Sequence, residues 1–284
     1  MNDKIRSVTD LIESLQGSLF IQDGYIYRGQ VNEEWKTKPS LLRRNADMSI
    51  TIKTFENALF SPLFQNMKIP FLTLLDPIEY LSILQHFEFP TRLLDWAYDP
   101  LVALFFSCYS QNNEFENKDG VFIASNSLQY ETIDLRKNTE YIMNYNFDNI
   151  DKNLFWSKLN NDDILIIKQL FKNPRLRNQN GCFMLFPLAT INIDDSEYFS
   201  LEEYVKFKDS HLKKLNNEEI DDKPKYVFLA KKLIDKNYKK AILLELEKKH
   251  GICKDSLFPL LNNDFEMEEQ FREMYISMLN YFPK

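Results

Sequence analysis

The segment LVALFFSCYS at residues 101–110 constrains the fold more than any other part of the sequence. It follows Asp99-Pro100, a pair typical of a helix start because aspartate caps free N–H groups and proline at the first position has no N–H to satisfy. A helix that is apolar on nearly every face must be covered on all sides. We therefore expect a central helix here, with the other elements packed around it.

Apolar spacing predicts further helices and several short strands around this segment. The sequence length of 284 residues allows one large domain or two small ones, and no Ser/Gly/Pro-rich linker divides it. These patterns predict an α+β protein, a single mixed domain over residues 1–284 with a small central sheet surrounded by helices. The expected helices are 7–16, 50–68, one that opens at Asp76-Pro77 and stops before Pro90, 200–215, 235–249 with Gly251 as its stop, and 265–279; the expected strands are 24–30, 121–125, 164–167, 182–186 and 226–230.

Charge and composition narrow the classes of partner. The chain has 35 basic and 42 acidic residues, a net charge of −7, so it lacks the diffuse positive field that draws proteins to nucleic acid or anionic lipid. No run approaches the roughly 18 apolar residues that span a bilayer, and the N-terminus lacks the apolar stretch of a signal peptide. With only three cysteines and no C-x-x-C pair, a disulfide framework is not expected. We expect a cytoplasmic protein without a membrane partner and with no strong signal for nucleic-acid binding, although a local basic cleft stays open.

Polar side chains stand among apolar elements at two places in the sequence. Arg28 lies in the strand predicted at 24–30, and Gln85, His86, Thr91, Arg92 and Asp95 follow one another around a predicted helix-loop-helix. Buried charges persist when they are paired or bind a ligand, so a structural ion pair between Asp95 and an arginine and a ligand site are both open. The guanidinium fork of arginine suits phosphate or carboxylate.

The three histidines give no metal site. His86, His211 and His250 lack ligand spacing, so no metal is predicted. Cys182 begins an apolar run, which favours a buried, inert thiol over a nucleophile. Trp35 and Trp96 are of a type more often found in a core or a lid than as stacking platforms.

Several motifs of this chain resemble the FRG domain, a bacterial family named for its Phe/Tyr-Arg-Gly motif. They are Tyr27-Arg28-Gly29, the stretch from Leu84 to Phe106, Asp119-Gly120 before a strand, and RNQNGCF at residues 177–183. The resemblance covers about residues 20–260, with flanking N- and C-terminal helices. Family members often occur beside phage-defence and abortive-infection genes, so the resemblance implies an effector of such a system. A defence-system partner protein and an unidentified macromolecular target are its implied partners.

A strand with Tyr-Arg-Gly is also similar to the start of the NAD site in mono-ADP-ribosyltransferases of the Arg-Ser-Glu class. This resemblance implies NAD as cofactor and an ADP-ribosyltransferase-like fold. No Ser-Thr-Ser strand follows, and near the third position of that class Gln179-Asn180-Gly181 offers an amide in place of a Glu-x-Glu or Gln-x-Glu carboxylate, so Asp95 would stand in for the glutamate. The residues implied are Arg28, His86, Asp95 and Gln179 as catalytic groups and Tyr27, Arg28, Gly29, Gln30, Thr91, Arg92 and Trp96 as cofactor-binding groups.

Two functions are therefore open from the sequence. The first is an enzyme that binds NAD or a related nucleotide and transfers ADP-ribose. The second is a non-enzymatic sensor or interaction module whose polar cluster is structural. An acid such as Asp95, Glu114 or Glu245 beside Arg28 in an open cleft favours the enzyme, whereas a sealed, mutually paired cluster favours the module.

Overall fold

The structure is a computed structural model, and it describes residues 4–17, 24–43, 77–86, 89–112, 114–134, 164–168, 174–186, 198–200 and 229–258. The helices predicted at 50–68, 200–215 and 265–279 lie outside the described residues, as does most of the strand predicted at 226–230. Within the described part of the chain, no helix is both long and apolar enough to cross a bilayer.

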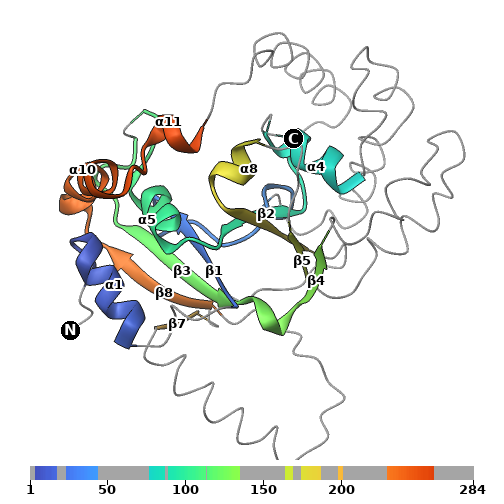
Figure 1. The fold of residues 1–284 in the computed structure, drawn as a ribbon, viewed down its shortest axis with the longest axis horizontal. Helices are drawn as coiled ribbons and strands as arrows, with labels where there is room; N and C mark the ends of the chain where they lie inside the picture. The colour runs from blue at the N-terminus through green and yellow to red at the C-terminus, as the bar shows by residue number, and fades with distance from the viewer. Residues whose placement is uncertain are drawn as a thin grey trace, which may run out of the picture.

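One mixed sheet of eight strands runs through the described residues in the order β4-β5-β6-β2-β1-β3-β8-β7 (Figure 1). The outer pairs β4–β5 and β7–β8 are parallel, and the other neighbours are antiparallel. The strands are β1 (Tyr25–Gln30), β2 (Leu93–Ala97), β3 (Gly120–Asn126), β4 (Glu131–Asp134), β5 (Leu165–Lys168), β6 (Gly181–Leu185), β7 (Tyr198–Ser200) and β8 (Leu229–Ile234).

The α+β class is confirmed, and the structure corrects the predicted strands in two places. Residues 93–97, expected as part of a loop between two helices, form β2. The strand expected at 226–230 continues further, because β8 extends to Ile234. Burial explains why these residues form a strand. Leu93 and Leu94 are both buried, although Asp95 interrupts the apolar run.

The described helices are α1 (Val8–Gly17), α4 (Pro77–His86), α5 (Pro100–Cys108), α8 (Pro174–Asn178), α10 (Lys239–His250) and α11 (Lys254–Leu257), with 3-10 turns η1 (Ser40–Arg43), η4 (Ser127–Gln129) and η7 (Lys236–Tyr238). The predicted start of α5 and the predicted stop of α10 are confirmed, whereas the helix expected from 235 begins at Lys239, after the 3-10 turn η7. The carboxylate of Asp99 accepts a hydrogen bond from Leu101 N at 2.8 Å, and Gly251 ends α10 in the left-handed region with φ 66°. Helices α1, α5 and α10 lie over the same part of the sheet (Figure 1).

The backbone of helix α5 approaches the sheet closely at two glycines. A Cβ on Gly29 of β1 would stand 1.9 Å from Ala103 O, and one on Gly120 of β3 would stand 2.1 Å from Ser107 O. The Ser107 hydroxyl lies within donor distance of Ala103 O of the same helix at 2.9 Å and of Val121 O of β3 at 3.0 Å, and its one proton is directed at these two carbonyls. The glycine of the Tyr-Arg-Gly motif is therefore required by the close approach of α5.

Alternate residues of the central strands enter two separate cores. Tyr27 and Phe122 pack with α1, α5 and α10 on one face. Ile26 and Val121 pack with residues of β2 and β6 on the other face. The expectation that the apolar segment forms a central helix is confirmed, because six of its residues are buried: Val102, Ala103, Leu104, Phe105, Ser107 and Cys108.

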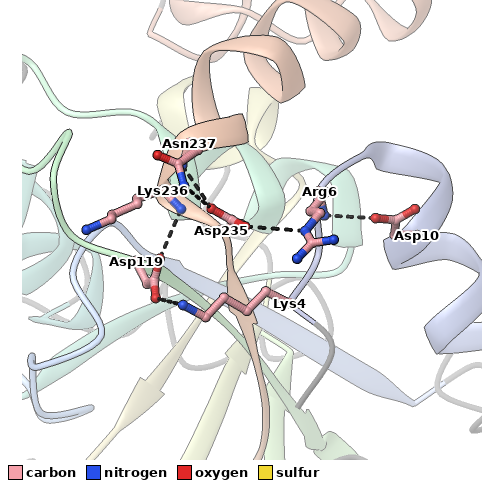
Figure 2. Close-up of polar contacts among 7 residues, drawn as sticks. All are labelled: Lys4, Arg6, Asp10, Asp119, Asp235, Lys236 and Asn237. Atoms are coloured by element: carbon pink, nitrogen blue, oxygen red, sulfur yellow. Dashed lines mark hydrogen bonds and ion pairs between the residues drawn. The ribbon is translucent and has the colours of Figure 1, made fainter. Parts of the chain in front are cut away.

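The N-terminal segment is fastened to the ends of β3 and β8 by a polar network (Figure 2). Lys4 pairs with Asp119, and Arg6 Nε lies 3.3 Å from Asp235 Oδ2. Ile5 joins β8 through its backbone, since Ile5 N donates to Leu233 O and Asp235 N donates to Ile5 O. Asp119 also accepts from Lys236 N at 3.0 Å, so one carboxylate links three segments that are distant in sequence.

Substitution of Gly29 by alanine should destabilise the protein strongly. The new methyl group would overlap the α5 backbone, and overpacking of this kind costs about 3 kcal/mol or more. Gly17→Ala is the matched control, because a Cβ there meets nothing within 4 Å. Urea unfolding should show a large loss for Gly29→Ala and none for Gly17→Ala; equal stabilities for the two variants would contradict direct helix-on-strand packing.

The Asp119 network should make stability depend on acid pH. Burial alone would raise the pKa of Asp119, but the hydrogen bonds from Lys4 and from Lys236 N hold it below its ordinary value of 3.8. A carboxyl with a depressed folded pKa stabilises the protein above its unfolded pKa, and this contribution disappears as pH falls from about 5 to below 3.

We expect Asp119→Asn to lower the free energy of unfolding by about 1–3 kcal/mol at pH 7. The difference from wild type should shrink when urea unfolding is repeated at about pH 3. Glu131→Gln, which changes an exposed carboxylate on β4, should leave stability unchanged at both pH values. A wild-type advantage that persists undiminished at low pH would contradict the assignment.

Candidate functional site

A cavity of about 260 Å³ lies where β1 and β2 separate. The two strands share a single Cα pair, Tyr27 with Ala97, whereas β1 pairs with β3 along its whole length. Beyond that pair, Gly29 and Asp95 line the cavity from the two strands. The described residues that line it are Tyr27, Arg28, Gly29, Ser82, Gln85, His86, Asp95, Trp96, Ala97, Ala103, Phe106, Leu176, Gln179, Phe183 and Phe258.

Arg28 bridges the separated strands with its side chain. Its Nη1 donates to the backbone carbonyl of Asp95 at 2.7 Å, taking the place of the missing strand partner. The same nitrogen lies 3.9 Å from Asp95 Oδ2, and the side chains are 14% and 54% exposed, respectively. The guanidinium is therefore fixed in the wall, while the carboxylate beside it is open to solvent.

All four residues expected to be catalytic line this cavity. Arg28 and Asp95 come from β1 and β2, and the half-buried His86 comes from the end of α4. Gln179 follows α8 and is buried; its Nε2 donates to Leu257 O at 3.2 Å. Because that bond uses the amide nitrogen, the Oε1 of Gln179 is the group that can accept a hydrogen bond from a ligand.

Among the residues expected to bind a cofactor, Tyr27, Gly29 and Trp96 also line the cavity. Burial raises the pKa of Tyr27 to about 12, with Tyr25 and Asp99 adding to the effect, so its phenol is neutral at physiological pH. Trp96 belongs to the core on the other face of the sheet. Trp96 therefore belongs both to the cavity lining and to that core.

The structure does not bring Gln30, Thr91 or Arg92 into the cavity, although the sequence placed all three at the ligand. Arg92 is completely buried and its Nη1 donates to Phe186 O at 2.7 Å. Thr91 is also completely buried, and its hydroxyl donates to Gln85 Oε1 at 2.6 Å. Gln30 accepts from Thr37 Oγ1 at 3.3 Å and lines a second, smaller cavity. Each of these three side chains has at least one hydrogen-bond partner within the fold, as is usual for buried polar side chains.

An aromatic wall was not anticipated from the sequence. Phe106 of α5 and Phe258 after α11 line the cavity with ring centroids 5.9 Å apart. Asn178 Nδ2 donates to Ser256 O at 3.0 Å and so helps hold the segment that carries Phe258 against α8. The sequence places Phe106 in the apolar helix, and no local pattern predicts its contact with Phe258, which lies far along the chain.

The acid beside Arg28 is Asp95, and neither of the other two acids considered lines the cavity. Glu245 lies on α10, where it accepts from Val8 N at 3.3 Å and from Lys249. Glu114 is exposed in the segment after α5. Among the described residues, no group of three or more His, Cys, Asp or Glu could hold a metal ion. The cavity therefore offers a cation, a carboxylate, an imidazole, an amide and aromatic rings.

Residues 23–116 match the family model of the FRG domain, so the chain carries an FRG domain over this range. The matched range holds β1, α4, β2 and α5, and with them Arg28, Gln85, His86, Asp95 and Phe106. No curated protein and no solved structure matches the chain. The similarity to ADP-ribosyltransferases is not shown by these comparisons.

Two of the three cysteines should be unreactive in the folded protein. Burial raises the pKa of both Cys108 and Cys182 to about 12, and the thiolate is the reactive form. Cys253 is partly exposed at the start of α11.

At about pH 8 we expect an aromatic disulfide reagent to modify one thiol rapidly in native protein and three after denaturation. Cys253→Ser should abolish the fast native reaction. Rapid native modification of that variant would contradict the burial of the other two thiols.

Proposed function

We propose that the cavity binds a nucleotide, with NAD as the leading candidate, through Arg28 and Asp95. The observation that carries this proposal is an arginine fixed in the wall 3.9 Å from a carboxylate that is 54% exposed in the same cavity. This arrangement favours a ligand site over the sealed, mutually paired cluster that a purely structural role requires.

The chemistry of the two groups selects the class of ligand. A guanidinium binds phosphate, and a carboxylate accepts hydrogen bonds from hydroxyl groups. A ribose phosphate carries both partners next to each other. The aromatic rings of Phe106 and Phe258 supply an apolar wall for a base. At about 260 Å³, the cavity is slightly below the ordinary range for ligand pockets, about 300–1,000 Å³, and suits one half of a dinucleotide.

The same groups support transfer of ADP-ribose. In this step the glycosidic bond between C1′ of the ribose and the nicotinamide nitrogen breaks, and nicotinamide leaves with the electron pair. The acceptor's oxygen or nitrogen bonds to C1′ and gives its proton to a base. The Asp95 carboxylate stabilises the positive charge that develops at C1′. His86 is the cavity group of the type most often used to take such a proton.

The match to the FRG domain supports an effector role in a phage-defence or abortive-infection system, because members of that family often occur beside genes of such systems. In this role the acceptor of ADP-ribose is a macromolecule of the cell or of the phage. A nucleotide sensor without turnover is the alternative, and it is supported by the hydrogen bonds that Thr91 and Arg92, neither of which lines the cavity, make within the fold.

The test is thermal unfolding with millimolar NAD together with an assay for released nicotinamide. NAD at a hundredfold excess over Kd should raise Tm by about 5 °C. Arg28→Gln should abolish this shift, while Lys248→Gln, which removes an exposed charge on α10, should keep it. Asp95→Asn should retain most of the shift and reduce nicotinamide release by about 100-fold or more.

The outcomes separate the two candidates. A Tm shift lost in Arg28→Gln without nicotinamide release would support the sensor and exclude the transferase. The absence of a shift with NAD, ADP-ribose, ATP and nicotinamide mononucleotide would refute nucleotide binding at this cavity.

A further inference from the structure

The carboxylate of Asp95 is held by a side chain that the sequence analysis did not place in the site. Gln85, in the last turn of α4, donates from Nε2 to Asp95 Oδ2 at 2.8 Å. Arg28 contacts the Asp95 residue mainly through the backbone carbonyl, and its nitrogen is 3.9 Å from the carboxylate. The glutamine amide therefore lies closer to the Asp95 carboxylate than the Arg28 guanidinium does.

The orientation of that amide is set by a buried hydroxyl. Thr91 Oγ1 accepts from Leu93 N at 3.2 Å and stands 2.6 Å from Gln85 Oε1. A hydroxyl has one proton to donate, and Gln85 Oε1 can only accept, so the proton must point to the glutamine. The oxygen end of the Gln85 amide is thereby directed at Thr91 and its nitrogen end at Asp95.

Thr91 is itself fixed by the backbone around it. Its N donates to Ser40 Oγ at 3.2 Å, and its carbonyl accepts from Leu41 N at 3.2 Å. The residue is completely buried. The buried Thr91 therefore determines how the Gln85 amide is turned, and through it the direction of the hydrogen bond to the exposed Asp95 carboxylate.

We propose that Gln85, oriented by Thr91, is the positioning residue of Asp95 and holds the carboxylate with one oxygen engaged and the other directed to the ligand. The proposal rests on the proposed function, since it assumes that Asp95 acts on a bound nucleotide. An amide N–H bonded to Oδ2 fixes the side-chain rotamer without neutralising the charge. Preorganisation of this kind matters most for a group that stabilises charge in the transition state.

The kinetic test uses the full chain with NAD as the probe. Gln85→Met keeps a similar length and removes both hydrogen bonds; it should lower nicotinamide release by about 10- to 100-fold while the Kd for NAD from calorimetry stays within about threefold. Thr91→Val should give the same defect and Thr91→Ser should restore activity. Gln111→Met changes an exposed glutamine outside the cavity and is the matched control.

A double variant distinguishes a relay from independent effects. If Thr91 acts through Gln85, Gln85→Met with Thr91→Val should be no slower than Gln85→Met alone. Additive losses, or a Gln85→Met enzyme as fast as wild type, would overturn the proposal.

A second measurement tests the positioning of Asp95 by Gln85 even if the wild-type protein neither binds nor cleaves NAD. With glutamine labelled by ¹⁵N, the side-chain amide signal of Gln85 should shift in Asp95→Ala and in Thr91→Val, and it should not shift in Glu131→Ala. Such shifts support the positioning of Asp95 even where nucleotide binding fails. An unchanged Gln85 signal in both variants would refute the relay.

Discussion

The contact between α5 and the sheet is the constraint on which the rest of the structure depends. Gly29 and Gly120 let the helix backbone approach β1 and β3 closely, and the Ser107 hydroxyl lies within donor distance of a carbonyl in each layer. Because α5 is apolar all round, it is covered by the sheet on one side and by α10 and its neighbours on the other. Ala103 and Phe106 of the same helix line the cavity, so the packing that builds the core also fixes one wall of the site.

The cavity arises because a sheet opens between two of its central strands. An opened ladder leaves backbone groups without strand partners, and such groups must find others. Arg28 supplies the donor for Asp95 O, which places a charged side chain where a main-chain N–H would otherwise stand. The Arg28 guanidinium is thereby held close to the exposed Asp95 carboxylate, at the opening between the two strands.

Much of the site could be predicted from residue types, and the remainder depended on pairing that no local pattern reveals. Arg28, His86, Asp95 and Gln179 do line one cavity, because a charged or amide group among apolar elements signals a special environment. The same reasoning could not tell a ligand-facing group from one satisfied inside the fold, so Thr91 was placed at the ligand when it bonds to Gln85.

The strand β2 shows the same limit at the level of secondary structure. A five-residue run interrupted by Asp95 has too few positions to show a period, and its pairing with β6 joins segments almost ninety positions apart. Phe258 is further still from Phe106 in sequence. Long-range partners of this kind follow from the three-dimensional arrangement, whereas helix caps such as Asp99 follow from adjacent residues.

The cavity is shared between two stretches of chain that can change independently. The cation and the carboxylate lie within the range of the FRG domain, residues 23–116, whereas Gln179, Phe183 and Phe258 lie beyond it. Substitutions in the second group would alter the shape and polarity of the wall without changing the pair of Arg28 and Asp95. A cavity divided in this way can change which ligand shape it admits while its charged pair stays constant.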